Sequence, residues 1–409
     1  MGRLTTLVGT AFVGAMALGA ARTSLVLSYE RAAVEVCNLV GEHYYRRNEP
    51  EVREAIEKCR REAESQVFLP SKAANIERIN DRLADIKTSH LSLYNPEQNR
   101  QIWENQGLDT GIRSRFVDDL LVVTKVVAGS PAEKAGLKKG DALIAIDGEA
   151  LAGPYAAQTA SGTLTVERKG EGMALDVKPV DLSEDLSPTL TPIGDGVLLV
   201  TMPSFLSQYW DAERWREMTK VFAGYKRIVV DLRDNAGGSF PAMLRALSPF
   251  RCEAPFVGSL YQPMKEGLVE VANMKDTLEA RSQLEQLTTS ARLRLRAFDT
   301  YGCYDGPVTV LIDSGTSSTA EIFAQSFYSR KSSRVWGHPS AGQVVMAQWF
   351  PVGAFGNENF ALSIPIAGYE TADGLDLENV GLRPQRILQY DLDVELAGRD
   401  SWIETAKQP

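Results

Sequence analysis

The stretch VTVLIDSGTSSTAEIFA, residues 308–324, contains the pattern that decides the fold of the largest part of the chain. An apolar run, a turn rich in Ser and Gly, and a run with apolar residues at helical spacing follow one another directly. Residues 196–205, 227–235 and 333–338 have the same strand-like composition. Strands alternating with helices predict an α/β layered domain over residues 190–395.

The turn inside this stretch is a candidate for nucleophilic chemistry. Ser318 stands where the helix begins, at the positive end of its dipole, and backbone N–H groups at such a place suit an oxyanion. A serine hydroxyl needs a neighbouring base to become nucleophilic, and the turn itself offers none. Ser318-Thr-Ala-Glu321 is also the S-x-x-E capping box, which requires no enzyme. Taken alone, the segment favours the cap, since caps are common.

A second turn in the same domain is DLRDNAGGSF, residues 231–240. Two glycines after a strand let the backbone come close to a ligand and direct an N–H group at it. A tight turn with no chemical role explains the same residues, and alone it is the better interpretation.

Residues 108–180 have a different character, with short strands joined by Gly-rich turns. The segment VVAGSPAEKAGLKKGDALIAIDGEAL, residues 126–151, resembles a PDZ domain, a fold that binds an extended peptide at a sheet edge. The resemblance implies that the loop at Gly111 and Ile112 binds the carboxylate of a substrate peptide. The second glycine of the family's loop is Arg113 in this chain. A PDZ-like domain that only packs between its neighbours is the alternative.

The beginning of the chain has the composition of an export signal. Arg3 precedes an apolar segment, residues 7–21, that is rich in small residues and short for a membrane span. We expect residues 1–21 to be a signal peptide and the protein to be exported, periplasmic or secreted. An uncleaved N-terminal anchor is the alternative, and only then would a membrane be a partner.

The four cysteines fit an oxidising compartment, because their number is even and none forms a CxxC zinc motif. Cys37 and Cys59 lie in two helix-like stretches of a helical region over residues 28–105, and Cys252 and Cys303 bracket an insertion. Pairing these neighbours is one of three possible connectivities. The insertion, residues 252–303, is either a lid or substrate wall, or a surface excursion.

Composition argues against a nucleic-acid-binding protein. The 409 residues carry a net charge of −9 and no dense basic run, so nucleic acid is not an expected partner. At this length the chain is long enough for two or three domains.

The order of these segments resembles the C-terminal processing (tail-specific) peptidases and the related tricorn core peptidase. The PDZ-like segment, DLRDNAGG, GTSSTAEIFA and finally ENVGLRP occur in the order seen in that family. The resemblance implies a multidomain α+β and α/β protein whose core is crotonase-like, with Ser318 as nucleophile. It also implies that Gly238 and Thr319 supply the oxyanion-hole N–H groups. The tail-specific enzymes use a lysine as base, and its position is occupied here by Gln343, which cannot accept a proton at neutral pH.

The tricorn branch implies a different base. Its Ser-His pair before the PDZ domain matches Ser89-His90, and its glutamate near the end of the chain matches Glu378. His90 would then be the general base, with Ser89 and Glu378 orienting it and stabilising its charged form. His338, close to Gln343 in the sequence, is the rival base, and His43 is expected to be packing or surface.

Together these observations predict an exported serine endopeptidase that cleaves unfolded or C-terminal segments of polypeptides. No metal or cofactor is expected. The alternative is an inactive family member that binds a peptide or another ligand, since retinoid-binding repeats share the fold and the lysine is missing.

Overall fold

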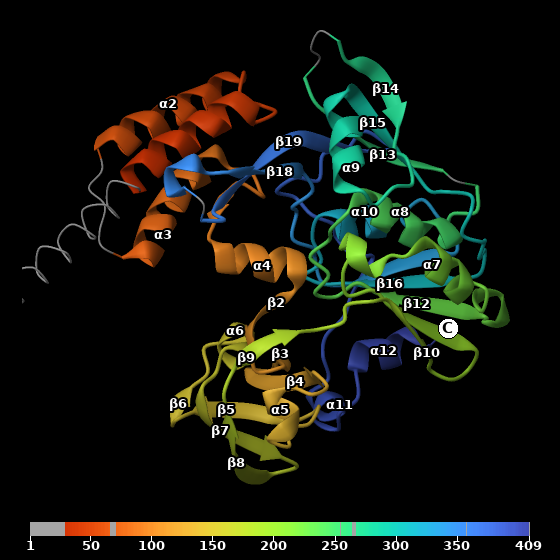
Figure 1. Cartoon of the computed structure of the whole chain (residues 1–409). Helices are drawn as coiled ribbons and strands as arrows, with labels where there is room; N and C mark the ends of the chain where they lie inside the picture. The colour runs from red at the N-terminus through yellow and green to blue at the C-terminus, as the bar shows by residue number, and fades with distance from the viewer. Residues whose placement is uncertain (1–28, 66–70, 254, 264–266, 357, 409) are drawn as a thin grey trace, which may run out of the picture.

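The computed structural model describes residues 29–65, 71–253, 255–263, 267–356 and 358–408 (Figure 1). The predicted signal peptide, residues 1–21, lies outside this part of the chain. Among the described residues, no helix is both long and apolar enough to cross a bilayer. The predicted class is confirmed: a helical N-terminal region, a small β domain and an α/β core follow one another.

The α/β core is built on one mixed sheet. Five of its strands run parallel, and β10 closes one edge as an antiparallel partner of β11. The order across the sheet is β10 (Thr189–Pro192), β11 (Val197–Thr201), β12 (Arg227–Asp231), β16 (Val308–Ile312), β17 (Ser333–Gly337) and β20 (Arg386–Ile387).

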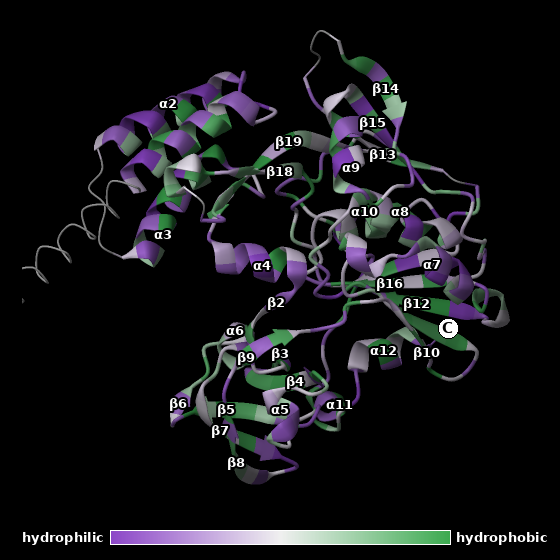
Figure 2. Ribbon diagram, viewed as in Figure 1, coloured by the Kyte–Doolittle hydropathy of each residue, from purple (hydrophilic) through white to green (hydrophobic). Residues whose placement is uncertain are grey.

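Both faces of this sheet are covered, which explains its nearly continuous apolar strands (Figure 2). Alternate residues pack in opposite directions: Leu198 and Val200 contribute to one apolar cluster, and Val197 and Leu199 contribute to the other. The first cluster lies under α7 (Ala212–Thr219), α8 (Phe240–Leu247) and α10 (Thr319–Gln325). The second lies under α12 (Ser401–Ala406), which follows α11 (Leu392–Leu396).

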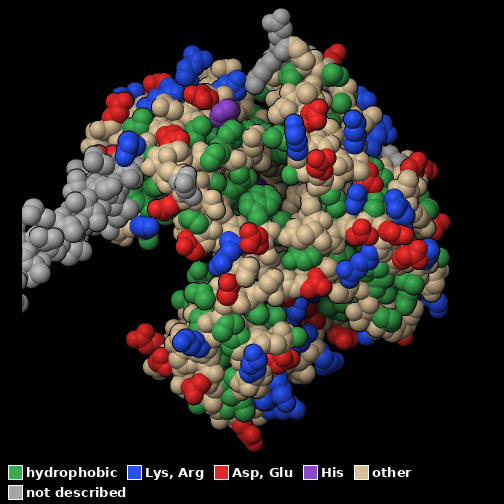
Figure 3. Space-filling view, viewed as in Figure 1, with side chains coloured by type: hydrophobic (Ala, Val, Ile, Leu, Met, Phe, Trp, Pro, Cys, Tyr) green, Lys and Arg blue, Asp and Glu red, His purple; other side chains and the backbone are tan. Residues whose placement is uncertain are grey.

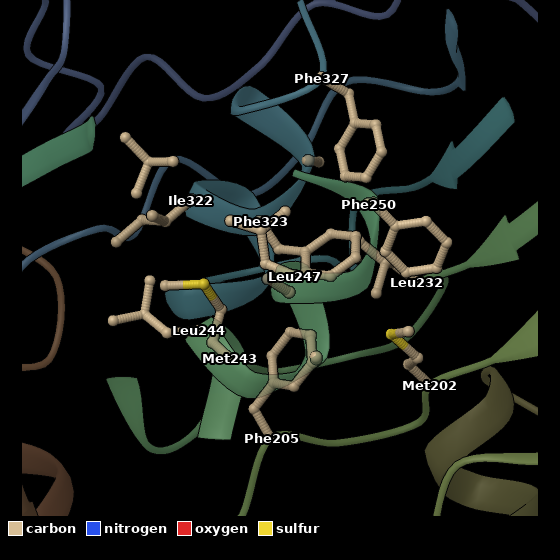
Figure 4. Packing of buried hydrophobic residues seen from close by; sticks show 14 of the residues in the cluster. Met202, Phe205, Leu232, Met243, Leu244, Leu247, Phe250, Ile322, Phe323 and Phe327 are labelled. Atoms are coloured by element: carbon tan, nitrogen blue, oxygen red, sulfur yellow. The ribbon is translucent and has the colours of Figure 1, made fainter. Parts of the chain in front are cut away.

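The helix that begins after Ser318 is anchored by aromatic packing (Figure 4). Phe323 of α10 lies 5.7 Å from the ring of Phe205 and 5.3 Å from that of Phe327. Phe323 is fully buried, as are Ala320 and Ala324. The predicted helical spacing is therefore confirmed, and the start of α10 is fixed relative to the core.

A second sheet joins three distant parts of the chain. Its order is β1 (Ser92–Tyr94), β19 (Ala361–Thr371), β13 (Phe256–Tyr261), β15 (Ser290–Arg296) and β14 (Val269–Asn273), with β18 (Met346–Pro351) also paired to β19. The insertion supplies β13, β14, α9 (Ala280–Thr288) and β15. The insertion is thus an integral part of this sheet.

The N-terminal region is a helical hairpin followed by two further helices. A helix over residues 29–43 is joined to α2 (Pro50–Ser65) by the Cys37–Cys59 disulfide. Cys252–Cys303 is the second disulfide, so the pairing of neighbours is confirmed. The remaining helices are α3 (Lys72–Leu83), which continues as a 3₁₀ turn over Ala84–Ile86, and α4 (Pro96–Glu104). Other 3₁₀ turns cover Ser207–Tyr209, Phe222–Gly224, Ser248–Phe250 and Gly353–Phe355.

The segment KTSHLSLY, residues 87–94, is extended only in part. Residues 92–94 form β1, whereas Ser89 and His90 lie in a turn. Lys87 and His90 both have positive φ, at 52° and 57°. The pattern of these residues predicts extended backbone throughout, which is wrong for Ser89 and His90, because hydrogen bonds to a distant part of the chain hold this turn.

The β domain is a five-strand antiparallel sheet with β6 (Glu149–Ala150) added to β5. The strand order is β3 (Ile112–Val117), β4 (Leu120–Val126), β5 (Ala142–Ile146), β7 (Gly162–Arg168) and β8 (Glu171–Val177). Its helices are α5 (Pro131–Lys134), capped by Ser130, and α6 (Pro154–Gln158). The ribbon of β2 (Gln106–Asp109) and β9 (Val180–Ser183) connects the domain to the rest of the chain.

Candidate active site

Ser318 lies at the N-terminus of α10 in an unusual backbone conformation. Its φ is 57° and its ψ is −128°, a combination that is strained for a residue with a Cβ atom. The Ser318 N–H donates to Glu321 Oε2 at 3.1 Å, which is one half of the predicted capping box. Strain of this kind concentrates at functional sites, so the cap and the site are not exclusive alternatives.

The two turns singled out in the sequence meet here. A Cβ atom placed on Gly237 would lie 2.7 Å from Ser318 Cβ and 3.0 Å from Thr319 N. The Phe205 N–H donates to the Gly237 carbonyl, and the Ser239 N–H donates to the Phe205 carbonyl, both at 2.8 Å. This pairing leaves the Gly238 N–H directed away from the segment that contains Phe205. Among the described residues, neither Gly238 N nor Thr319 N has a hydrogen-bond acceptor. Both groups are thus available for an oxyanion.

Ser89, His90 and Glu378 form a continuous hydrogen-bonded chain. Ser89 Oγ lies 2.8 Å from His90 Nδ1 and donates to Glu378 Oε2 at 3.1 Å. The Ser89 N–H donates to the other carboxylate oxygen, Oε1, at 2.6 Å. These contacts join positions 289 residues apart in the sequence, and all three residues are half-buried.

The hydrogen bonds among Ser89, His90 and Glu378 select one tautomer of the His90 imidazole. Because the Ser89 hydroxyl donates its proton to Glu378, its oxygen accepts a proton from His90 Nδ1–H. The other ring nitrogen, Nε2, is then unprotonated. A neutral imidazole in this form is a proton acceptor at Nε2, which a general base requires.

Burial lowers the pKa of His90 from its ordinary value, and the negative charge of Glu378 raises it by a smaller amount. The direction favours the neutral ring at physiological pH. It follows that the imidazole does not need a high external pH to act as a base.

One loop, residues 340–344, links the serine half of the site to the histidine half. Glu321 Oε2 accepts the Gln343 N–H at 2.8 Å as well as the Ser318 N–H. Glu378 Oε2 accepts the N–H of the next residue, Val344, at 2.9 Å. The two halves are therefore held by adjacent residues of this loop. No direct hydrogen bond joins Ser318 to His90 among the described residues, and in a site without substrate such a bond is often long.

Glu321 is a site residue whose full role the sequence did not reveal. Its side chain is fully buried and also accepts the Ser340 hydroxyl at 2.6 Å and the Gly342 N–H at 2.8 Å. Burial raises the pKa of Glu321, and its four hydrogen-bond donors, on Ser318, Ser340, Gly342 and Gln343, oppose that shift. The capping box pointed to Glu321, but its contacts with the distant loop could not be read from local spacing.

The side chains of Gln343 and of the other two histidines take no part in these contacts. The Gln343 side chain is exposed, and only its backbone N–H takes part in the site. His338 packs against Trp402, with ring centroids 4.9 Å apart, in the cluster under α12. His43 stacks on Phe350 at 4.3 Å. Among the described residues, no group of His, Cys, Asp or Glu could hold a metal ion.

The comparisons with known proteins identify two domains in the chain. Residues 196–387 match peptidase family S41, and residues 122–159 match the PDZ domain. The α/β core, residues 196–387, is a peptidase family S41 domain. The protein is a serine-type peptidase with a PDZ domain, and the β domain described above is that PDZ domain. The family match includes Ser318 and Glu378 and does not extend to Ser89 and His90.

Individual relatives of this S41 peptidase are distant. The carboxyl-terminal-processing protease of Synechocystis sp. is 22% identical over 333 residues, which cover 77% of this chain and 71% of that protein. The photosystem II D1 C-terminal processing protease structure has a TM-score of 0.52 at 18% identity and covers 90% of this chain and 96% of that one. The structure of mature CPAF complexed with lactacystin has a TM-score of 0.60 at 13% identity, covering 93% and 98%. At these identities the structures establish the shared fold.

Proposed function

We propose that this S41 peptidase is an exported endopeptidase that cleaves unfolded polypeptides or their C-terminal segments, with Ser318 as nucleophile and His90 as base. The hydrogen-bonded chain from His90 through Ser89 to Glu378 is the observation that carries the proposal. It supports a histidine base in a protein whose family position for lysine is occupied by Gln343. The two disulfide bonds support an oxidising compartment.

The proposed reaction is acyl transfer in two steps. Ser318 Oγ attacks the peptide carbonyl carbon while its proton passes to His90 Nε2. The oxyanion accepts hydrogen bonds from the N–H groups of Gly238 and Thr319. His90 then gives the proton to the amine nitrogen as the peptide C–N bond breaks. In the second step His90 takes a proton from a water molecule that attacks the acyl ester, and returns it to Ser318 Oγ as the ester bond breaks. Ser89 and Glu378 keep the imidazole in the tautomer that accepts at Nε2.

The test is digestion of an unstructured protein such as casein by the wild type and four variants, Ser318→Ala, His90→Ala, Gln343→Ala and His338→Ala. Ser318→Ala and His90→Ala should each lower kcat by on the order of 10³-fold or more, because members of one catalytic unit fail together. Gln343→Ala should be mild, since the Gln343 side chain is exposed and its backbone N–H remains.

Two outcomes would contradict the proposal. Near wild-type turnover by His90→Ala, with loss of activity in Gln343→Ala or His338→Ala, would show that the base is not His90 but a group near the 340–344 loop. No cleavage by the wild type would favour the alternative function, an inactive family member that binds a peptide or another ligand.

A further inference from the structure

The PDZ domain has an open sheet edge at β3. This strand is the last of its sheet and pairs only with β4 among the described strands. The helix α6 packs beside it, as in domains that add an extended peptide as a further strand. Phe116 on β3 and Tyr155 on α6 are 49% and 69% exposed, so apolar side chains are available next to this edge.

The loop at the start of β3 already contains a carboxylate. The Gly111 N–H donates to Asp109 Oδ1 at 2.5 Å, and the Ile112 N–H donates to Thr110 Oγ1 at 3.4 Å. These are the two N–H groups that a carboxylate-binding loop would offer to the end of a peptide. In this protein each of them already donates to a side chain two residues earlier.

Asp109 is held in this position from two sides. It is the last residue of β2, whose pairing with β9 fixes its backbone. Arg113, at the position of the family's second loop glycine, contacts Asp109 Oδ2 at 3.0 Å. The same guanidinium donates to Glu184 at 2.8 Å, and Lys125 contacts Glu184 at 2.5 Å. The nearby cations are therefore engaged with carboxylates of this chain.

We propose that the β3 edge of this PDZ domain takes an internal extended segment of a polypeptide and does not select a free C-terminal carboxylate. A second carboxylate at the loop would meet the charge of Asp109 at short range, and it would find the N–H groups of Gly111 and Ile112 already bonded. An internal segment avoids both penalties, because it needs only the backbone edge of β3 and apolar contacts. The inference rests on the proposed function in that the segment belongs to the polypeptide substrate.

The experiment measures capture of peptides by the full-length Ser318→Ala protein. Two pools of random peptides of about ten residues, one with C-terminal carboxylates and one with isotopically labelled carboxamides, are mixed in equal amounts and the bound peptides are quantified by mass spectrometry. We expect an acid-to-amide ratio within about twofold of one. Adding Asp109→Ala should raise the ratio at least tenfold, because it frees the Gly111 N–H and removes the charge. Asp109→Asn should raise it by less.

Asp119→Asn is the matched control, since Asp119 is an exposed residue of the β3–β4 turn in the same domain. It should leave the ratio unchanged. A ratio of ten or more in the parent protein, no change with Asp109→Ala, or capture of neither pool would overturn the inference. Capture requires no cleavage, so failure of casein digestion by the wild type would contradict the peptidase proposal and leave this result standing.

Discussion

Ser89 separates the imidazole of His90 from the carboxylate of Glu378, so the negative charge acts on the ring through one intervening hydroxyl. In a Ser-His-Asp triad the carboxylate contacts the ring directly and strongly favours its protonated form. Here the attraction is weaker than the cost of burying a charged imidazole, and the pKa of His90 is lowered. The arrangement thus orients the ring, and the carboxylate changes the pKa of the ring less than burial does.

The fall of activity at low pH tests this balance between burial of His90 and its attraction to Glu378. Only the neutral imidazole accepts a proton, so kcat/KM should fall as pH drops, with a midpoint below about 6.5, the unperturbed value. Glu378→Gln removes the charge that raises the pKa of His90. Its midpoint should therefore lie at still lower pH, with reduced activity on the plateau. The measurement is kcat/KM against pH for both proteins.

His338→Gln is a suitable control, because His338 packs in a separate cluster and its loss should leave the midpoint unchanged. A wild-type midpoint above 6.5, or a higher midpoint in Glu378→Gln, would count against the assignment of His90 as the titrating base.

At the residue scale, the sequence predicted contacts between residues close together in the chain and missed those between distant residues. The capping box predicted the bond between Ser318 and Glu321, three residues apart. The same carboxylate also binds Ser340, Gly342 and Gln343, and nothing in the spacing of those residues indicated it. Ser89, His90 and Glu378 were identified only through a family resemblance, because contacts across 289 positions leave no local pattern.

At the scale of elements, the site is the meeting of two strand-to-helix turns. Strands β12 and β16 are neighbours in the core sheet, so the turns that follow them leave the same edge. The GG turn after β12 and the turn before α10 then contact each other at Gly237 and Ser318. The spacing of the apolar residues and the composition of the segments between them predicted both turns correctly. They could not predict the turn at Ser89 and His90, which depends on bonds to Glu378.

Gly237 provides a test of this contact. It has a φ of 90°, and a Cβ atom there would meet Ser318 Cβ at 2.7 Å. We expect Gly237→Ala to lower kcat on the order of 10²-fold, because a displacement of Ser318 by a fraction of an ångström disturbs the line of attack. The measurement is kcat on casein, with the thermal midpoint recorded for the same sample.

Gly194→Ala is the matched control. Gly194 has nearly the same φ, 91°, but a Cβ atom there would meet nothing within 4 Å. Both substitutions should lower stability by about 1 kcal/mol through backbone strain. Equal activity of the two variants would show that the space beside Ser318 does not matter.

At the scale of the whole molecule, the second sheet connects the regions that the sequence suggested as separate units. β1 begins two residues after His90 and pairs with β19, and β19 pairs with β13 of the insertion (Figure 1). On the visible face, apolar side chains gather around a hollow between α4 and β18, while charges of both signs cover the periphery (Figure 3). Sequence patterns predicted the regions and the cysteine pairs. The way the insertion joins the sheet depends on pairing between distant strands, which local patterns do not encode.

The two disulfides differ in exposure, and this difference gives a prediction for the intact molecule. Cys37 and Cys59 are 1% and 3% exposed, whereas Cys252 and Cys303 lie at the surface at the base of the insertion. Denatured without reductant, the protein should show no free thiol by alkylation mass spectrometry. Under mild reductant in native conditions, Cys252 and Cys303 should be alkylated first, because exchange requires access of the attacking thiolate to a sulfur.

Reduction of the outer pair should also lower the thermal midpoint before the inner pair reacts. Cys252–Cys303 closes a span of 51 residues, for which the chain-entropy relation gives up to about 4 kcal/mol. The inner pair closes a span of 22, for which the same relation gives about 3 kcal/mol. The sample alkylated only at Cys252 and Cys303 can be melted beside the untreated protein. Alkylation of Cys37 or Cys59 first, or four labelled cysteines without reductant, would contradict the arrangement in which a buried disulfide secures the helical hairpin and an exposed one closes the insertion.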